Sequence, residues 1–408
     1  MTLTAVEEVR AAILTSCAPL PSAELLLVDA LGCVAAAAVT ADADVPAWAN
    51  TAMDGYAVRA EDTTDAPVEL EVVAVLAAGA APDPARPVGP GQAVRIMTGA
   101  PMPPGADSVV IVEWTSPVHG GRVRVDVPVA PGQNVREPGS DVRAGQEVVS
   151  PGTLLTPALL GLMASVGRDT VEVHRRPRVG VLSTGDELVE PPAELRTGQI
   201  YDSNRPLLLG LVIEAGCTPV DLGCARDDRG AIAAALESGL DRCDAVLLSG
   251  GVSIGDFDFV KDVFGRLGAA RSWDVAMKPG KPLAWGLLRG RPVFGLPGNP
   301  VSAAVSFEVF ARPALRLLAG HPEPVPPTVA AVAGEDFGRR PDGKVHLVRA
   351  RATREGPDGR LHVRSAGGQG SHMLAALAAG NALVVVPDGS GVSAGETVQV
   401  VLLAGAPG

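Results

Sequence analysis

Three glycine-containing loops hold most of the residues that could do chemistry, and each follows a short apolar run. They are STGDEL (183–188), SGGVSIGDFD (249–258) and GLPGNPVS (295–302). Glycine lets backbone N–H groups approach a phosphate closely, and a helix that begins beyond the loop adds a favourable dipole. One such loop is equally consistent with an ordinary tight turn. Three loops in one region predict an anion-binding site.

The same loops hold four carboxylates, Asp186, Glu187, Asp256 and Asp258. Aspartate at the start of a helix is also a common N-cap, so capping remains an alternative for each one. Carboxylates gathered in one place repel one another, and a divalent cation such as Mg²⁺ relieves that repulsion. Because Mg²⁺ often bridges carboxylates to substrate phosphates, an acidic pocket for an anionic substrate predicts a bridging metal.

The stretch KPGKP (278–282) contains two of the four lysines of the chain. Basic residues elsewhere are nearly all arginine, so compact ammonium charges are favoured at this place. Two prolines and a glycine restrict the shape of the loop. The alternative is a solvated surface turn.

Three further residues lie in turns outside this region. They are Asp54 in NTAMDGYAV (50–58), Thr98 in MTGAPMP (97–103) and Asp141 in EPGSD (137–141). Taken alone, each is ordinary turn chemistry. The six histidines have no metal spacing and are expected to be structural. No Ser-His-Asp or Cys-His arrangement follows from spacing.

The glycine loops lie in a stretch where predicted strands alternate with helices. Strands are predicted at 178–182, 218–222, 245–248 and 293–296, and helices at 206–215, 228–239, 257–267 and 300–318. This alternation predicts βαβ units and a mostly parallel sheet. In open sheets of this kind ligands bind beyond the carboxyl ends of the strands, where the three loops would meet.

The whole chain is predicted to be an α/β multidomain protein. A central doubly wound, mostly parallel α/β domain covers 177–320. A helix-rich N-terminal part, 1–54 and 140–176, is expected to dimerise and to carry an inserted β domain at 55–139. A small β-barrel-like domain covers 321–408.

Local patterns support these domains. TAVE (4–7) is expected to be a capping box for a helix with Val6, Val9 and Ile13 on one face, and a second helix is expected at 156–166. Strands are predicted in the inserted domain at 68–76, 93–97, 108–113 and 122–129, and in the last domain at 328–332, 344–352, 360–364, 382–386 and 397–403.

Composition narrows the partners and the compartment. The net charge of −12 argues against nucleic acid or an anionic membrane as the main partner. Five cysteines without CxxC or zinc spacing are expected to be buried free thiols in a reducing compartment. The amphipathic start does not resemble a secretion signal, and the weakly charged run 150–167 suits a buried helix better than a membrane span. We expect a cytoplasmic protein.

Together these stretches resemble the molybdopterin molybdenumtransferase family, which includes bacterial MoeA and the gephyrin E domain. The matching motifs occur in family order as AMDGYAV (52–58), MTGAPMPPGAD (97–107), PGSDV (138–142), GVLSTGDELVE (180–190), SGGVSIGDFDF (249–259), MKPGKP (277–282) and GLPGNPVSA (295–303). The flanking regions fit the family's domain plan.

The resemblance implies the last step of molybdenum-cofactor assembly. The family takes adenylated molybdopterin and molybdate, cleaves the pyrophosphate bond with a divalent cation and releases AMP. Its members are elongated homodimers whose active cleft lies between the α/β domain of one subunit and the N-terminal part of the other. That arrangement would bring Asp54, Thr98 and Asp141 to the α/β loops.

The resemblance also assigns roles to residues of this chain. The catalytic set it implies is Asp54, Asp141, Glu187, Asp258, Lys278 and Lys281, with Mg²⁺ expected among Glu187, Asp256 and Asp258. The implied substrate-binding set is Thr98, Thr184, Gly185, Asp228 or its neighbour Asp227, Ser249, Gly250, Gly251, Ser253, Pro297, Gly298, Asn299, Pro300, Arg349 and Ser371.

One position departs from the family pattern. Many members have a basic residue four positions before the first lysine of KPGKP, where this chain has Asp274.

Two rival functions are a molybdopterin adenylyltransferase, whose fold resembles 177–320 alone, and a non-catalytic molybdopterin-binding scaffold. The additional domains argue against the first rival, and the nearly complete catalytic motifs argue against the second.

Overall fold

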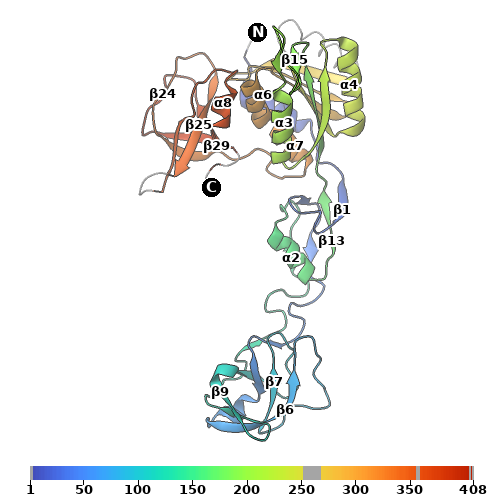
Figure 1. Cartoon of the computed structure of the whole chain (residues 1–408), viewed down its shortest axis with the longest axis vertical. Helices are drawn as coiled ribbons and strands as arrows, with labels where there is room; N and C mark the ends of the chain where they lie inside the picture. The colour runs from blue at the N-terminus through green and yellow to red at the C-terminus, as the bar shows by residue number, and fades with distance from the viewer. Residues whose placement is uncertain (1–2, 251–267, 355–358, 404–405, 407–408) are drawn as a thin grey trace.

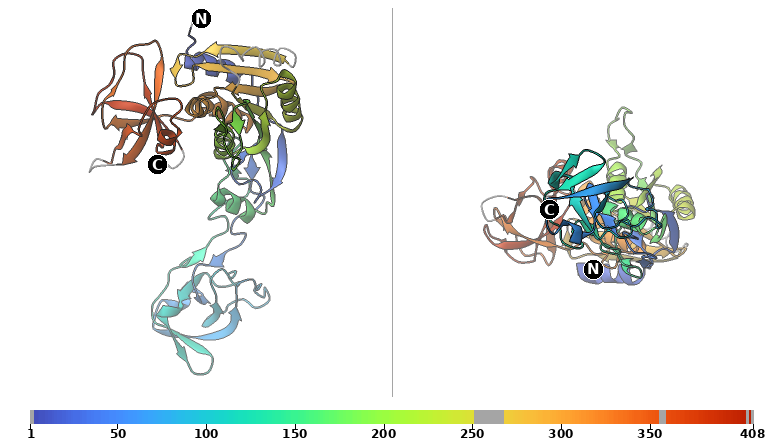
Figure 2. Two further views of the ribbon diagram at one scale, coloured as in Figure 1. Left: turned by 45° about the horizontal axis from the view of Figure 1, so that its top comes forward. Right: turned by 90° about the horizontal axis from the view of Figure 1, so that it is seen from below.

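The computed structural model describes residues 3–250, 268–354, 359–403 and 406 of the 408-residue chain. The molecule is elongated (Figure 1). An α/β domain and a β-barrel lie side by side at one end, a small middle domain follows, and a separate β domain forms the far end. The two chain termini lie at the α/β end, and the left view of Figure 2, turned by 45°, shows the same arrangement.

The α/β domain is built on a six-stranded sheet with the order β17-β14-β18-β22-β21-β19. The first four strands are parallel, which confirms the predicted sheet. Two antiparallel strands that were not predicted extend one edge. The bounds are β14 (Arg178–Thr184), β17 (Thr218–Ala225), β18 (Ala245–Ser249), β19 (Gly268–Asp274), β21 (Pro282–Leu288) and β22 (Arg291–Leu296).

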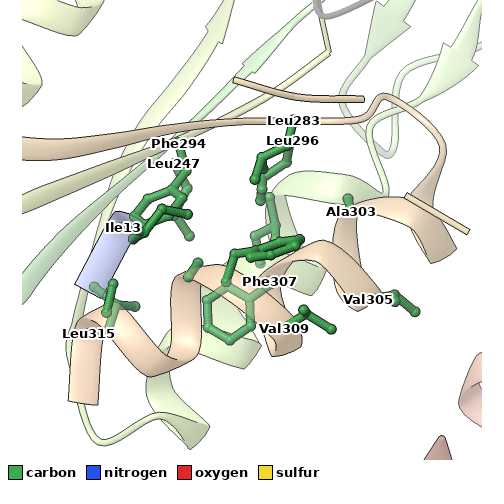
Figure 3. Close-up of a cluster of buried hydrophobic side chains, with 14 of the residues drawn as sticks. Ile13, Leu247, Leu283, Phe294, Leu296, Ala303, Val305, Phe307, Val309 and Leu315 are labelled. Atoms are coloured by element: carbon green, nitrogen blue, oxygen red, sulfur yellow. The ribbon is translucent and has the colours of Figure 1, made fainter. Parts of the chain in front are cut away.

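Helices cover both faces of this sheet, as a doubly wound fold requires. The buried side chains of α4 (Arg229–Arg242) form a cluster with one face, including Leu182 and Leu248. The larger cluster on the other face includes α1 (Val6–Thr15), α3 (Asn204–Glu214), α6 (Pro300–Ser306) and α7 (Arg312–Leu318). Figure 3 shows Ile13, Phe294, Phe307 and Leu315 packed together in this core. The helix predicted at 257–267 lies outside the described residues.

The helix predicted at 300–318 has the expected ends but is interrupted. A π-helical turn, η3 (Phe307–Ala311), separates α6 from α7. Pro313 has no N–H to donate to the turn before it, which favours a local departure from α-helical bonding. Within this turn, the buried Glu308 carboxylate accepts two hydrogen bonds from Arg312, at 2.6 and 2.7 Å.

The prediction of a helix-rich N-terminal part is wrong. Its first helix, α1, packs into the α/β core through Val6, Val9 and Ile13, as the amphipathic pattern predicted for those residues. The middle domain contains a single helix, α2 (Pro157–Ser165), and several short strands. These strands are β1 (Ser22–Leu26), β2 (Val34–Ala35), β3 (Val39–Thr40), β12 (Glu147–Val149) and β13 (Thr170–His174).

The predicted capping box at 4–7 is also wrong. Ala5 occupies the N-cap position of α1, and no side chain caps this helix. Thr4 instead forms an isolated bridge beyond β19: its N–H donates to the Asp274 carbonyl at 2.9 Å, and its carbonyl accepts from Ala276 N–H at 2.7 Å. Its backbone groups are thus satisfied by a segment 270 positions away, which local sequence cannot reveal.

The far β domain is a six-stranded sheet with the order β8-β5-β7-β6-β10-β9, and all four strands predicted there are present. Its bounds are β5 (Gly55–Val58), β6 (Val68–Leu76), β7 (Gln92–Ile96), β8 (Ser108–Ile111), β9 (Thr115–Val118) and β10 (Arg122–Val125), with 3-10 turns η1 (Ala60–Thr63) and η2 (Val112–Trp114). The two-stranded ribbon of β4 (Asn50–Thr51) and β11 (Val135–Arg136) lies at its base.

The C-terminal domain is a closed barrel, as predicted. The strand order β25-β26-β23-β29-β27 closes because β27 pairs back onto β25. The bounds are β23 (Val329–Ala333), β25 (Val345–Arg354), β26 (Leu361–Ser365), β27 (Ala382–Val386) and β29 (Thr397–Leu402), with β24 (Phe337–Gly338), β28 (Gly391–Val392) and α8 (Leu374–Ala378) beside them. A short strand from the α/β domain, β20 (Met277–Lys278), adds to β25 and joins the two domains.

The cysteines are free thiols, as expected, but are not all buried. Cys33, Cys217 and Cys243 are buried, Cys17 is half-buried and Cys224 is exposed. Burial raises the pKa of Cys217 to about 12 and that of Cys17 to about 11, so both thiols are protonated at neutral pH. Across the part of the chain that the structure describes, no helix is both long enough and apolar enough to cross a membrane.

Candidate active site

The three predicted glycine loops meet at the carboxyl ends of β14, β18 and β22. A Cβ atom added to Gly250 would lie 2.5 Å from the Thr184 carbonyl oxygen and 2.9 Å from Thr184 Oγ1. A Cβ on Gly298 would lie 3.7 Å from the Cα of Gly250. Gly250 also has a φ of 96°, a conformation that side chains disfavour. Only glycine therefore allows this close approach of the β14 and β18 loops.

Asn204, which is not among the predicted site residues, joins two of these loops by hydrogen bonds. Its Nδ2 donates to Ser249 Oγ at 2.7 Å and to the Gly298 carbonyl at 2.7 Å. Asn204 is the first residue of α3, whereas the predicted helix began two residues later. The polar run YDSNR (201–205) just before Pro206 is the signal that could have indicated a site residue here.

Among the residues that the structure describes, two buried polar atoms at this junction have no hydrogen-bond partner. They are Thr184 Oγ1 and Asn204 Oδ1. Leaving a buried polar group unpaired costs about 1–3 kcal/mol, so these two atoms call for an explanation, and a bound ligand is one. Both belong to residues that contact the β18 loop, at Gly250 and Ser249 respectively.

The neighbouring segment at the start of α3 is anchored by charge. The Arg205 guanidinium binds Asp202 Oδ2 at 3.2 Å and Asp221 Oδ2 at 2.7 Å, and it also pairs with Glu190. Asp202 is buried and accepts a hydrogen bond from Ser183 Oγ at 3.1 Å. This network fixes the end of β14 relative to Asn204.

Two of the described carboxylates have different surroundings: that of Glu187 lies over the β14 loop, and that of Asp228 caps α4. The Glu187 carboxylate folds over Gly185, where a Cβ would lie 2.7 Å from Oε2 and 2.9 Å from Oε1. Asp228 caps α4 by accepting from Ala231 N–H at 2.9 Å. Gly185, Asp186 and Asp228 line a cleft of about 560 Å³ beside the ends of β14 and β17.

Four predicted site residues of the β18 loop fall beyond Gly250. Gly251, Ser253, Asp256 and Asp258 lie outside the described residues. Within 3–250, 268–354 and 359–403, no group of three or more His, Cys, Asp or Glu side chains could hold a metal ion. Of the three predicted metal ligands, only Glu187 is among the described residues.

The lysine loop is shaped by its contact with α6. Gly280 has a φ of 94°, and a Cβ there would lie 2.5 Å from Met277 Cε and 2.7 Å from Ser306 Oγ. Lys278 pairs in register with His346 of the barrel. It lines a cavity of about 500 Å³ whose walls carry both basic residues, including Arg339 and Arg340, and the acidic residues Glu335, Asp336 and Asp342.

Lys281 has different surroundings. Its Nζ lies 3.1 Å from Asp274 Oδ2, so the acidic residue that departs from the family pattern neutralises one of the two predicted anion-binding lysines. The backbone fixes this pair, because Val275 N–H donates to the Lys281 carbonyl at 2.7 Å. The two lysines of the loop are therefore not equivalent.

The start of α6 joins the third glycine loop to the barrel. Pro300 is in the first turn of α6, and Asn299 is its N-cap residue, following Pro297 and Gly298. Val301 N–H donates to the Ser371 carbonyl at 3.2 Å. Arg349 shapes that barrel loop: it is 1% exposed and donates to the carbonyls of Gly368 at 2.7 Å and Gly370 at 3.2 Å.

Asp54 and Thr98 form a pair in the far β domain. Asp54 Oδ1 accepts hydrogen bonds from Thr98 Oγ1 and from Thr98 N–H, each at 2.7 Å, and these bonds lower the pKa of Asp54. Asp54 precedes β5, and Thr98 follows β7. Both strands belong to the far β domain, at the opposite end of the molecule from the α/β domain (Figures 1 and 2). Asp141 lies beside the chain that links the middle and far domains, where its N–H donates to the Val45 carbonyl at 3.0 Å. A single chain does not bring these three residues to the glycine loops.

The fold and its loops define a molybdopterin-binding class of protein. The α/β region, residues 180–317, matches the family described as a probable molybdopterin binding domain. Residues 4–167 match the MoeA N-terminal region, domains I and II, and residues 330–403 match the MoeA C-terminal region, domain IV.

The chain belongs to the molybdopterin molybdenumtransferase family. It is 41% identical to molybdopterin molybdenumtransferase 2 of Mycobacterium tuberculosis, over 97% of each chain. It is 38% identical to the molybdopterin molybdenumtransferase of Haemophilus influenzae, over 94% of each. The crystal structure of a molybdopterin biosynthesis MoeA protein from Pyrococcus horikoshii superposes with a TM-score of 0.81 at 31% identity, covering 99% of this chain and 100% of that one.

Proposed function

We propose that this protein is a molybdopterin molybdenumtransferase, which inserts molybdenum from molybdate into adenylated molybdopterin and releases AMP. The observation that carries the proposal is the junction of Thr184, Gly250 and Gly298, in a chain whose relatives bear that name over nearly their whole length. Full-length similarity also argues against an enzyme that resembles the α/β domain alone.

The junction suits an anionic, polar substrate. Glycines at 250 and 298 leave the loop backbones uncovered by side chains, and backbone N–H groups are the usual donors to phosphate oxygens. The unpartnered Thr184 Oγ1 and Asn204 Oδ1 supply polar groups that a bound ligand could satisfy after a small shift.

We further propose that the reaction uses Mg²⁺. Among the described residues, Glu187 offers hard carboxylate oxygens of the kind that Mg²⁺ prefers, and the sequence adds Asp256 and Asp258 to it. The proposed roles of Asp256 and Asp258 as Mg²⁺ ligands rest on the sequence alone, because both lie outside the described residues. When bound, Mg²⁺ would offset the charge of the pyrophosphate.

The lysine loop would act on the leaving group. As the P–O bond of the pyrophosphate breaks, negative charge develops on the departing AMP, and a preorganised ammonium stabilises that charge. Lys278 already faces an open cavity. Lys281 would have to exchange Asp274 for a substrate oxyanion.

We also propose a homodimer whose clefts are shared between subunits. Asp54 and Thr98 are at the far end of the chain from Glu187, so a second copy is the simplest way to add them to one cleft. The free thiols support a reducing compartment such as the cytoplasm.

The test is direct. Purified protein incubated with adenylated molybdopterin, molybdate and Mg²⁺ should release AMP, and Glu187→Gln and Asp258→Asn should each slow that release strongly. Absence of AMP release by the wild type would overturn the proposal. Tight binding of molybdopterin without AMP release would instead support a non-catalytic binding protein.

A further inference from the structure

The far β domain contains an apolar pocket of about 520 Å³ that the proposed mechanism does not use. Its walls include Trp48, Ala80, Pro82, Pro101 and Met102. Trp48 is 60% exposed. Large apolar side chains gathered at a hollow of this volume are typical of sites for small ligands.

The pocket is built on a rigid support. The segments 49–51 and 99–102 pair through three backbone hydrogen bonds, from Thr51 to Ala100 (3.1 Å), from Gly99 to Thr51 (2.9 Å) and from Met102 to Ala49 (2.9 Å). A Cβ added to Gly99 would meet nothing within 4 Å. The pocket is therefore preformed and open above Gly99, so a flat ligand would not need to reorganise its walls.

The Asp54 carboxylate is hydrogen-bonded to the residue that precedes one wall residue of this pocket, Gly99. Gly99 follows Thr98, which donates both its bonds to Asp54 Oδ1. Among the described residues, Asp54 Oδ2 accepts no hydrogen bond, so it is available to a ligand. An exposed indole ring in the pocket wall and a negatively charged hydrogen-bond acceptor next to that wall therefore lie in the same part of the far β domain.

We infer that this pocket binds the pterin ring of the substrate, with the ring against Trp48 and its 2-amino and N3–H groups directed to Asp54. The inference rests on the proposed function, which makes a pterin the substrate. A pterin presents two adjacent N–H donors at this edge, which match a carboxylate. Adenine, the other flat ring of the substrate, presents an N–H donor beside the N1 acceptor, which a carboxylate repels. Stacking on an aromatic face is available to either ring, so the carboxylate decides between them.

The experiment measures binding of neopterin, a fluorescent pterin, to the full-length protein by fluorescence anisotropy, with AMP as the comparison ligand. Trp48→Ala should weaken neopterin binding about tenfold, the scale of lost ring stacking. Trp48→Phe should retain most of the affinity, because it keeps an aromatic face. Asp54→Asn should also weaken neopterin binding. The matched control is Val75→Ala, because Val75 has a similar exposed fraction, 65% against 60% for Trp48, and lies in the same domain but outside the pocket.

Each outcome decides the inference. No neopterin binding by the wild type, or equal binding by Trp48→Ala, would overturn it. Loss of AMP binding in Trp48→Ala without loss of neopterin binding would assign the pocket to the purine and also overturn it.

The AMP-release assay separates this inference from the proposed function. If the wild type releases AMP and Trp48→Ala has an unchanged KM for adenylated molybdopterin, the inference fails while the proposed function stands. If the wild type releases no AMP but neopterin binding depends on Trp48, the proposed function fails and the pterin pocket stands.

Discussion

At the scale of single residues, the pair of Asp274 and Lys281 controls how much positive charge the lysine loop offers. Both side chains are partly exposed, and an ion pair of this kind contributes about 0–1 kcal/mol to stability. A substrate oxyanion can therefore displace Asp274 at little cost. The acidic residue would weaken anion binding without removing the lysine.

We predict that Asp274→Asn lowers the KM for molybdate or for adenylated molybdopterin about two- to tenfold, with little change in kcat. The difference in KM between the variant and the wild type should become smaller at high salt, because salt screens the attraction between Asp274 and Lys281 in the wild type. AMP release at varied substrate and ionic strength measures this. Asp241→Asn is the control, since Asp241 is an exposed partner of Arg289 elsewhere. Unchanged KM values would contradict the prediction.

Thr98 sets the protonation of Asp54. Its two hydrogen bonds hold the pKa of Asp54 below the ordinary value, so this carboxylate stays ionised as the pH falls, until the pH passes below that lowered pKa. We predict that Thr98→Val, which removes the hydroxyl bond and keeps the backbone bond, moves the acid limb of the kcat/KM profile to higher pH. Thr115→Val, at another threonine of the same domain, should leave the limb in place. A limb that does not move would show that Asp54 does not titrate in the reaction.

At the scale of elements, α6 is where the lysine loop, the third glycine loop and the barrel meet. The lysine loop contacts its side chains at Gly280, the glycine loop runs into its first turn, and Ser371 accepts from its Val301 N–H. Because Asn204 also binds Gly298, α3 is joined to the same junction. A substitution that disturbs one of these contacts should therefore displace predicted substrate-binding residues of both the α/β domain and the C-terminal barrel.

We predict that Gly280→Ala destabilises the protein by about 2–4 kcal/mol, because its Cβ would overlap Met277 and Ser306 at a positive φ. The rate of AMP release should fall by more than the loss of folded protein explains, because the same loop contains Lys278 and Lys281. Gly290→Ala is the matched control: Gly290 also has a positive φ, but a Cβ there would meet nothing within 4 Å, so we expect only about 1–2 kcal/mol. Denaturant unfolding and AMP release measure both. Equal effects of the two substitutions would contradict the packing argument.

At the scale of the whole molecule, elongation separates the two halves of the proposed cleft. Strand β7, which ends just before Thr98, and helix α3, which begins at Asn204, are at opposite ends of one chain (Figure 1). The middle domain, with a single helix and short strands, acts as the spacer between them. A cleft shared between two copies requires this spacing, whereas a cleft within one chain would require a large bend.

We predict that two inactive variants, Asp54→Asn and Glu187→Gln, restore activity when they are unfolded together and refolded as a mixture. Half of the dimers would be mixed, and each mixed dimer would have one intact cleft of two, so activity should reach about a quarter of the wild type. The same variants refolded separately and then combined are the control. No recovery in the co-refolded mixture would contradict the shared cleft.

Local sequence was sufficient for most elements and for the three glycine loops. The strand at 68–76 and the strand at 382–386 have the predicted bounds, because apolar runs between turn residues are a property of a few consecutive positions. The parallel sheet followed from the alternation of strand and helix, and its topology then placed Thr184, Gly250 and Gly298 at one edge.

The tertiary structure decided which side chains meet. Thr4 bridges to Val275 where a helix cap was expected, Asn204 binds residues 45 and 94 positions away, and Asp274 pairs with Lys281. None of these contacts leaves a trace in the periodicity of the chain. They depend on how the sheet, α6 and the barrel pack, and a polar group takes whichever partner that packing brings within hydrogen-bond distance.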